Sequence, residues 1–301
     1  MNDPIRTGKL TKHFRRTDAV NGLDLTVPTG SIYALIGPNG AGKTTTIKLL
    51  MNILRATSGT AEVFGVDSRR LGPAERRRIG YCSENQHMPD WMTVDYFLRY
   101  LRPFYPKWDV QLEDELVRQF ELPRDRKLKH LSRGMRMKAA LASSLAYRPE
   151  LIVLDEPFTG LDALVREELA GGLLERAEGT TILISSHDLA DIESFASHVG
   201  YLDNGRLRFS EEMTTLSNRF RQVEVTFDAP ASLPSALPAG WTQPKAAGAV
   251  LRFVDTGFDA HRTAAEVQRL FPQARAVDYQ PMGLREIFVA LALAGREKAA
   301  A

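Results

Sequence analysis

The stretch GPNGAGKTT, residues Gly37–Thr45, decides the fold expected for this chain. It holds three glycines and a lysine followed by threonine. A short apolar run, Ser31–Ile36, precedes it and has the composition of a buried strand. A helical pattern follows over residues 43–54. The sequence therefore predicts a strand, a glycine-rich turn and a helix in direct succession.

The residue types in this turn suit a polyphosphate. Glycines at 37, 40 and 42 let successive backbone N–H groups point into one concavity, and the start of the helix adds positive partial charge. Lys43 can reach the terminal phosphates, and the Thr44 hydroxyl can bind Mg²⁺. A chance glycine-rich turn is disfavoured because the strand and helix flank it as a P-loop requires. The predicted phosphate-binding residues are Gly37, Pro38, Asn39, Gly40, Ala41, Gly42, Lys43, Thr44 and Thr45.

A second apolar run ends in two acidic residues. Leu151–Leu154 leads to Asp155, whose carboxylate at the end of a buried strand can hold Mg²⁺ or its waters. Glu156 follows directly and is placed to orient or deprotonate a water that attacks the γ-phosphate. A surface Asp-Glu pair after a strand is the alternative, and the nearby P-loop pattern makes it the weaker one.

The composition is that of an ordinary globular protein. The chain has 301 residues, of which 44% are hydrophobic and 25% charged. Its net charge of +2 gives no argument for nucleic acid or an anionic membrane as partner. The single cysteine, Cys82, excludes a disulfide framework and favours a reducing compartment. No apolar run approaches the roughly 18 residues that span a bilayer. We therefore expect a cytoplasmic chain that reaches a membrane only through a partner.

The order of elements predicts an α/β domain. The segment before residue 31 alternates like strands and turns. Strand signals at Leu151–Leu154 and Thr181–Ile184 are separated by a helical pattern over about 163–176, which favours a parallel sheet. The helical stretch over about residues 88–148 is interpreted as an insertion into that sheet domain.

Composition shifts near residue 221, where a Pro-, Ala- and Gly-rich stretch predicts turns. We therefore expect two domains, residues 1–221 and a small α+β domain over residues 222–301. The strands expected in the second are Gln222–Phe227, Ala249–Val254 and Ala274–Tyr279, and its helices are Ala260–Leu270 and Gly283–Leu293.

Over about residues 5–210 the chain resembles the nucleotide-binding subunit of ABC transporters. Besides the P-loop and the Asp-Glu pair, the motifs follow the family's order. They are Phe14 in place of the adenine-stacking aromatic, Gln86 in place of the Q-loop glutamine, Leu131–Met135 (LSRGM) in place of the signature, Thr159–Asp162 (TGLD) as the D-loop, and His187 as the switch histidine. The resemblance implies a P-loop NTPase (RecA-like) core with an N-terminal antiparallel β-subdomain and an inserted helical subdomain.

The resemblance also implies roles for these residues. Two subunits would bind head to tail around two ATP molecules, so that Ser132 and the Gly134 N–H contact the nucleotide held by the other subunit. Asp162, in the D-loop, would also contact a nucleotide. The implied catalytic set is Lys43, Gln86, Glu156 and His187. The implied Mg²⁺ ligands are Thr44, Gln86 and Asp155.

Several of these positions allow another interpretation. Ser132 could simply cap a helix, Phe14 could be a core phenylalanine, and a lone histidine such as His187 is often a surface residue. Arg133 replaces the first glycine of the signature and Met135 its glutamine. Arg133 would either add charge near the nucleotide or pair with a carboxylate of the partner, and the sequence leaves both open.

The segment after Gln86 is rich in aromatic residues. Residues 87–109 read HMPDWMTVDYFLRYLRPFYPKWD, which suggests a groove for a helix of another protein. The resemblance implies docking of transmembrane subunits here, in a bacterial type with separate ATPase and membrane chains. For each aromatic residue taken singly, a place in the core is the alternative.

The predicted function is ATP hydrolysis that powers an ABC transporter, with ATP and Mg²⁺ as cofactors. The chain would form a homodimer, or a heterodimer with a sister subunit, on the inner face of the membrane, and no nucleic acid is expected. A soluble ABC-type ATPase acting on DNA or ribosomes is the alternative function. A P-loop metabolic kinase ranks last, because the signature, Gln86 and His187 would then have no role.

Overall fold

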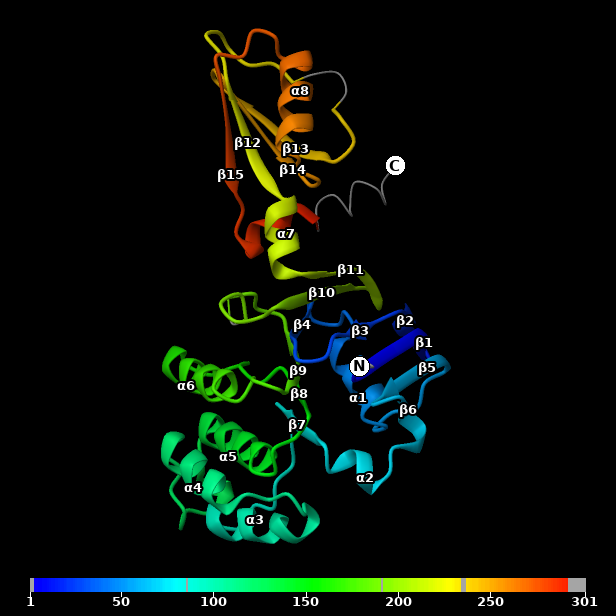
Figure 1. The fold of residues 1–301 in the computed structure, drawn as a ribbon, viewed down its shortest axis with the longest axis vertical. Coiled ribbons are helices and arrows are strands. Elements are labelled where there is room, and N and C mark those ends of the chain that lie inside the picture. The colour runs from blue at the N-terminus through cyan, green and yellow to red at the C-terminus, as the bar shows by residue number, and fades with distance from the viewer. Residues whose placement is uncertain (1–2, 85, 191, 234–236, 292–301) are drawn as a thin grey trace. The chain divides into compact units, whose positions relative to one another are not determined.

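A computed structural model describes residues 3–84, 86–190, 192–233 and 237–291 (Figure 1). The chain divides into two compact units after Ser210, earlier than residue 221, where the composition changes. The helix α7 (Met213–Arg219) belongs to the second unit, in which the Phe258 N–H donates to the Arg219 carbonyl at 2.8 Å. Each unit is described by itself below.

A six-stranded sheet forms the centre of the first unit. Its strands lie in the order β11 (Arg206–Glu212), β10 (His198–Asp203), β4 (Ile32–Ile36), β9 (Thr181–Ser186), β8 (Leu151–Asp155) and β7 (Ile79–Ser83). From β10 to β7 each neighbouring pair is parallel. The parallel α/β sheet is therefore confirmed. The carboxyl ends of β4, β7, β8 and β9 meet at one edge of this sheet, and the predicted site residues follow them.

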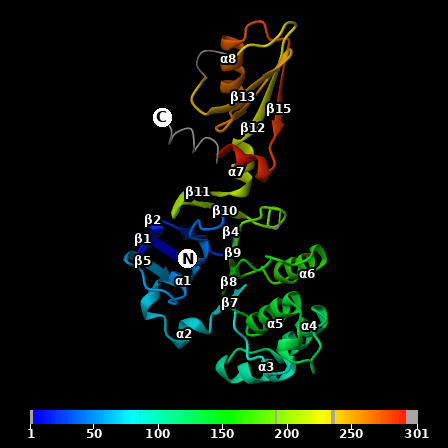
Figure 2. The ribbon, with the colours of Figure 1, turned by 180° about the vertical axis from the view of Figure 1, so that it is seen from behind.

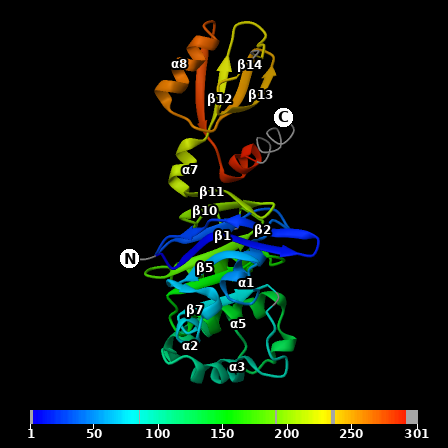
Figure 3. The ribbon, with the colours of Figure 1, turned by 90° about the vertical axis from the view of Figure 1, so that its right-hand side faces the viewer.

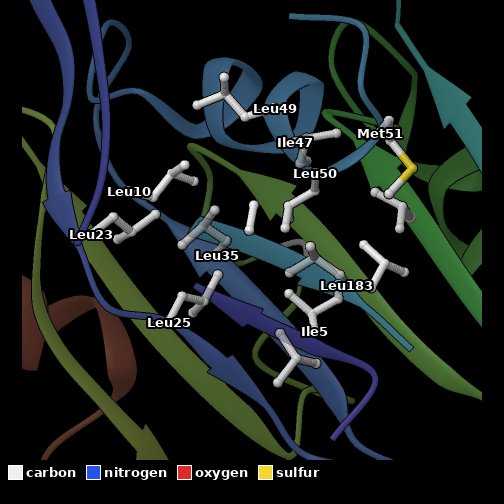
Figure 4. Packing of buried hydrophobic residues seen from close by; sticks show 14 of the residues in the cluster. Ile5, Leu10, Leu23, Leu25, Leu35, Ile47, Leu49, Leu50, Met51 and Leu183 are labelled. Carbon is white, nitrogen blue, oxygen red and sulfur yellow. The ribbon is translucent and has the colours of Figure 1, made fainter. Parts of the chain in front are cut away.

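An antiparallel sheet completes the first unit. Its strands are β2 (Thr17–Leu23), β1 (Ile5–Phe14), β5 (Ser58–Val63) and β6 (Val66–Asp67), and β3 (Thr26–Val27) also pairs with β1. Ile5 and Leu10 from this sheet pack with Leu35 and Leu183 of the central sheet and Ile47 of α1 (Lys43–Leu50), all fully buried (Figure 4). This shared core fixes the P-loop between the two sheets.

The helical insertion has its own caps. Thr93, Asp109 and Ser132 accept backbone N–H groups at the starts of α3 (Val94–Leu101), α4 (Val110–Gln119) and α5 (Arg133–Leu145). In Figure 1 these three helices lie together beside β7. The other helices of the unit are α2 (Pro73–Arg76), α6 (Ala163–Leu174) and the 3₁₀ turns η1 (Ser68–Arg70), η2 (Arg102–Phe104) and η3 (Leu128–His130).

The second unit is a four-stranded antiparallel sheet with a helix on it. Its strands lie in the order β13 (Trp241–Ala247), β14 (Val250–Asp255), β12 (Arg221–Thr226) and β15 (Ala276–Pro281). Helix α8 (Ala260–Leu270) lies along one face of this sheet and adds Val267 to its core (Figures 2 and 3). Residues 284–291 are helical, and the last two residues of the helix expected there lie outside the described residues.

Strand β13 lies within the Pro-, Ala- and Gly-rich stretch that was expected to hold turns. Pro244 is tolerated because β13 is an edge strand, where the missing N–H breaks no ladder on the open side. A register shift between Thr242 and Lys245 accompanies it, with Gln243 at a φ of 55°. No helix in the described part of the chain has the length and apolar composition needed to cross a membrane.

The shared core of the first unit predicts a large effect of one truncation. Leu183 is fully buried in it, so Leu183→Ala should lower the free energy of unfolding by about 2–5 kcal/mol. Leu164→Ala is the matched control, because that side chain is 65% exposed and should change stability by no more than about 0.5 kcal/mol. Urea denaturation of the full chain measures both, and equal effects of the two variants would contradict this packing.

Candidate functional site

The predicted phosphate-binding loop borders a cavity of about 530 Å³ at the carboxyl edge of the parallel sheet. The loop, Glu156 and His187 directly follow strands β4, β8 and β9 at this edge. The lining residues are Thr17, Ala19, Asn39, Gly40, Ala41, Gly42, Lys43, Thr44, Thr45, Glu84, Glu156, Thr159 and His187. The cavity thus gathers most of the residues predicted to act on a nucleotide.

Two glycines of the loop are required by close backbone contacts. A Cβ on Gly42 would lie 2.2 Å from the Ala19 carbonyl oxygen, and the φ of Gly42 is 106°, which other residues rarely adopt. A Cβ on Gly37 would lie 2.1 Å from the Leu202 carbonyl oxygen. The loop therefore packs against β2 on one side and β10 on the other, and side chains at either position would displace it.

Lys43 folds back onto the loop that precedes it. Its Nζ donates to the carbonyls of Gly37 at 2.7 Å and Pro38 at 3.2 Å. The same atom forms an ion pair with Glu156 Oε1 at 3.1 Å. Only 5% of the Lys43 side chain is exposed, so its charge is held at one point of the cavity wall.

Asp155 is buried in a network of hydroxyl groups. The hydroxyls of Thr44 and Ser185 both donate to Asp155 Oδ1, each at 2.8 Å. Burial raises the pKa of the Asp155 carboxyl from 3.8, and these two hydrogen bonds oppose that shift. The oxygens of Thr44 and Asp155 form a pair of hard donors of the kind that Mg²⁺ prefers.

Glu156 is held by three partners. Its Oε2 contacts His187 Nδ1 at 2.7 Å and accepts the Thr159 hydroxyl at 3.0 Å, while Oε1 faces Lys43. Burial acts to raise the pKa of this carboxyl, but the bonds from His187 and Lys43 outweigh burial and lower it below 4.5. Its backbone φ of 52° is unusual for a glutamate.

The structure keeps some predicted residues apart from this cavity. Gln86 is not among the described residues that line it, and the Gln86 Oε1 is buried without a hydrogen-bond partner. Ser132 and Asp162 cap the starts of α5 and α6, where they accept the N–H groups of Met135 and Val165. Gly134 is buried, and a Cβ on it would lie 3.0 Å from the Val165 side chain.

The place of Phe14 excludes its interpretation as a core residue. Its side chain is 46% exposed at the end of β1, and Lys12 Nζ lies 5.1 Å from the ring centroid. Phe14 pairs with Thr17 across the β1–β2 hairpin, and Thr17 lines the cavity. The exposed ring therefore lies on the hairpin that contributes Thr17 to the cavity lining.

Glu84 lines the cavity but was not among the predicted site residues. It follows β7 directly, and its N–H donates to the Asp155 carbonyl at 3.0 Å. The signal for it was present: like Glu156, it is an acidic residue directly after a strand of the parallel sheet. Gln86, two positions later, is the residue that the resemblance places at the Q-loop glutamine.

Comparison with known proteins agrees with this geometry. The family model described as ABC transporter matches residues 20–159. The chain is 32% identical to the ABC transporter ATP-binding protein YtrB of Bacillus subtilis (strain 168), over 76% of this chain and 79% of YtrB. It is also 32% identical to the daunorubicin/doxorubicin resistance ATP-binding protein DrrA of Streptomyces peucetius, over 95% of this chain and 92% of DrrA. The chain belongs to the ABC transporter ATP-binding proteins.

Solved structures give the same answer for this ABC transporter ATP-binding protein. One described as the ATP binding subunit of an ABC transporter matches with a TM-score of 0.65 and 27% identity, over 71% of this chain and 92% of that one. The P-loop NTPase fold and the ABC resemblance are thereby confirmed. The alternative of an ATPase acting on DNA or ribosomes is not favoured, because the relatives are transport and resistance proteins.

The two adjacent acidic residues should affect stability in opposite directions at neutral pH. Because the pKa of Asp155 is raised in the folded state, protonated Asp155 stabilises the fold. This contribution to the free energy of unfolding is fully present below pH 3.8 and is lost as the pH rises through the folded-state pKa. The lowered pKa of Glu156 gives a contribution that is present above 4.5 and is lost as the pH falls through the folded-state pKa. We therefore expect Asp155→Asn to raise, and Glu156→Gln to lower, the free energy of unfolding near pH 7.

Urea denaturation at several pH values measures both variants, and each isosteric amide serves as the control for the other. Both differences from the wild type should shrink as the pH falls toward about 4. Changes of the same sign in the two variants near pH 7 would contradict the opposite shifts.

Proposed function

We propose that this ABC transporter ATP-binding protein hydrolyses ATP in the cavity behind the P-loop. The observation that carries the proposal is Glu156, which is held at the cavity wall by Lys43, His187 and Thr159. Its lowered pKa keeps the carboxylate ionised near pH 7, as a group that orients a water or accepts its proton must be. A relative of 26% identity is described in its ADP conformation, which supports a nucleotide in this place.

The residues present fit a magnesium ion beside the nucleotide. Thr44 Oγ1 and Asp155 Oδ1 lie 2.8 Å apart, so both oxygens can turn to one cation that also binds phosphate and water. Mg²⁺ bound there would neutralise charge on the phosphates. Burial of Asp155 makes its charge costly, and a cation would offset that cost.

The chain's own residues would then do the following. The N–H groups of the P-loop and the start of α1 bind phosphate oxygens, and Lys43 balances their charge. Glu156 orients the attacking water and accepts its proton. His187, 2.7 Å from Glu156, holds that carboxylate in place and faces the cavity where the γ-phosphate would lie.

Some of the predicted nucleotide-binding residues lie away from the P-loop cavity of their own chain, as expected if they serve a second subunit. Ser132 is exposed at the start of α5 and is not among the described residues that line the P-loop cavity, and the same holds for Asp162. We propose that these residues and Gly134 serve the nucleotide of a second subunit, in a homodimer or a heterodimer with a sister chain. The start of α5 contains no acidic residue, so its dipole can face phosphate without repulsion.

A second cavity supports docking of transmembrane subunits. It measures about 410 Å³ and is lined in part by Phe97, Tyr100, Tyr105 and Tyr147. Trp91, Tyr96 and Phe104, beside it in sequence, expose about half of their side chains or more. Large apolar side chains exposed around a hollow are typical of a surface that receives a helix. We propose that the chain works on the cytoplasmic face of a membrane through this surface.

The role of Glu156 in hydrolysis can be tested directly. Glu156→Gln should lower the rate of phosphate release from ATP at least about 100-fold, because the amide cannot accept the proton of the water. ATP binding, measured by calorimetry on the same preparation, should persist. Glu150→Gln is the control, since Glu150 pairs with Arg78 away from the cavity and should leave the rate unchanged. Hydrolysis by Glu156→Gln at the wild-type rate would refute the assignment.

The docking surface predicts a separate loss of function. Tyr100→Ala removes a half-exposed ring that lines the apolar cavity, so co-purification with the membrane subunits should fall about tenfold. ATP binding should stay unchanged, because the substitution lies outside the P-loop cavity. Leu174→Ala, an exposed apolar residue on α6, is the control. Undiminished co-purification of Tyr100→Ala would exclude this surface.

A further inference from the structure

The arginine at the altered position of the signature is paired within its own chain. The Arg133 guanidinium donates to Glu84 Oε1, which joins the start of α5 to the residue after β7. This pair within one chain differs from both interpretations that the sequence leaves open for Arg133. Glu84 lines the P-loop cavity, so the pair links a signature residue to the nucleotide site of the same subunit.

The surroundings of the pair are shaped to hold it. A Cβ on Gly160, whose φ is 69°, would lie 2.6 Å from an Arg133 guanidinium nitrogen, so the glycine leaves room for the arginine. Glu84 and Thr159 also line a neighbouring cavity of about 360 Å³, and Arg133 is part of its wall. Glu84 therefore stands between the two cavities, with Arg133 on one side and the P-loop on the other.

The P-loop cavity carries several acidic side chains, and the Arg133–Glu84 pair neutralises one of them. Glu84 and Glu156 line the cavity, and Asp155 lies beside it with its carboxylate on Thr44. Lys43 is already paired with Glu156. An unpaired carboxylate at Glu84 would repel a polyphosphate, and Arg133 is the cation that neutralises it.

We propose that Arg133 is a positioning residue that acts through Glu84 and sets the affinity of the P-loop cavity for nucleotide. The inference rests on the proposed nucleotide site and goes beyond it, because it gives the signature arginine a task in its own subunit. The Arg133 side chain is 50% exposed and that of Glu84 29%, so the pair contributes little to folding. Removing either partner should leave the fold intact.

Charge alone then predicts opposite effects of the two single variants. Arg133→Ala removes a positive charge and should weaken ATP binding roughly three- to tenfold. Glu84→Gln removes a negative charge and should tighten it by a similar factor. The double variant restores the net charge and should bind as the wild type does. All differences should shrink in about 1 M salt, where charges are screened beyond about 3 Å.

The test is calorimetric titration of the full chain with ATP, first in EDTA and then with Mg²⁺. Arg136→Ala is the matched control, because Arg136 lies on the same helix, pairs with Asp90 and is not among the described residues that line the P-loop cavity. It should bind ATP as the wild type does.

Three outcomes would overturn the inference while leaving the nucleotide site standing. The first is weaker ATP binding in both single variants. The second is weak ATP binding by Arg133→Ala that is not reversed when Glu84→Gln is added. The third is an equally large loss of ATP binding in Arg136→Ala. The first would indicate a merely structural tie, and the second an action of Arg133 on the partner's nucleotide. Binding by Lys43→Ala as tight as by the wild type would instead refute the proposed nucleotide site itself, and this inference with it.

Discussion

The parallel register of β4, β8 and β9 is the constraint on which the site depends. Ile36 pairs with Ser186, and Asp155 pairs with Ser185, so three chain segments far apart in sequence end side by side. Each strand is buried along its whole length, so a slip of register would expose apolar side chains. The packing of the core thus fixes the positions of the P-loop, the acidic pair and His187 to within hydrogen-bond distance.

This dependence explains how much the sequence could predict. Buried parallel strands are short runs of apolar residues, and polar residues that follow such runs must gather at one edge. The P-loop pattern predicted Lys43 and Thr44, the acidic pair after a buried strand predicted Asp155 and Glu156, and the family resemblance predicted His187. The structure brings all five together at that edge. The helix predicted over Ala260–Leu270 has the same bounds in the structure, where it is α8. Its signals are local, because Asp259 caps its start and an amphipathic pattern runs along it.

Features that depend on contacts across the fold could not be found this way. The composition around Pro244 suggests turns, and only its place at a sheet edge makes a strand possible. Glu84 follows β7 directly and lines the cavity, and neither the motifs nor the family resemblance pointed to it. The pairing of Arg133 with Glu84 joins residues 49 positions apart, and a local sequence pattern cannot predict such a contact.

The site also concentrates features that do not favour folding. Asp155 is buried with a raised pKa, and Glu156 holds a positive φ that costs of order 1–3 kcal/mol in such residues. The surrounding strands and the shared core are fully buried and can offset these terms. A cation bound beside Thr44 would relieve the first, because it would give the Asp155 carboxylate a partner for its charge. Ligand binding at these residues would therefore also raise the free energy of unfolding.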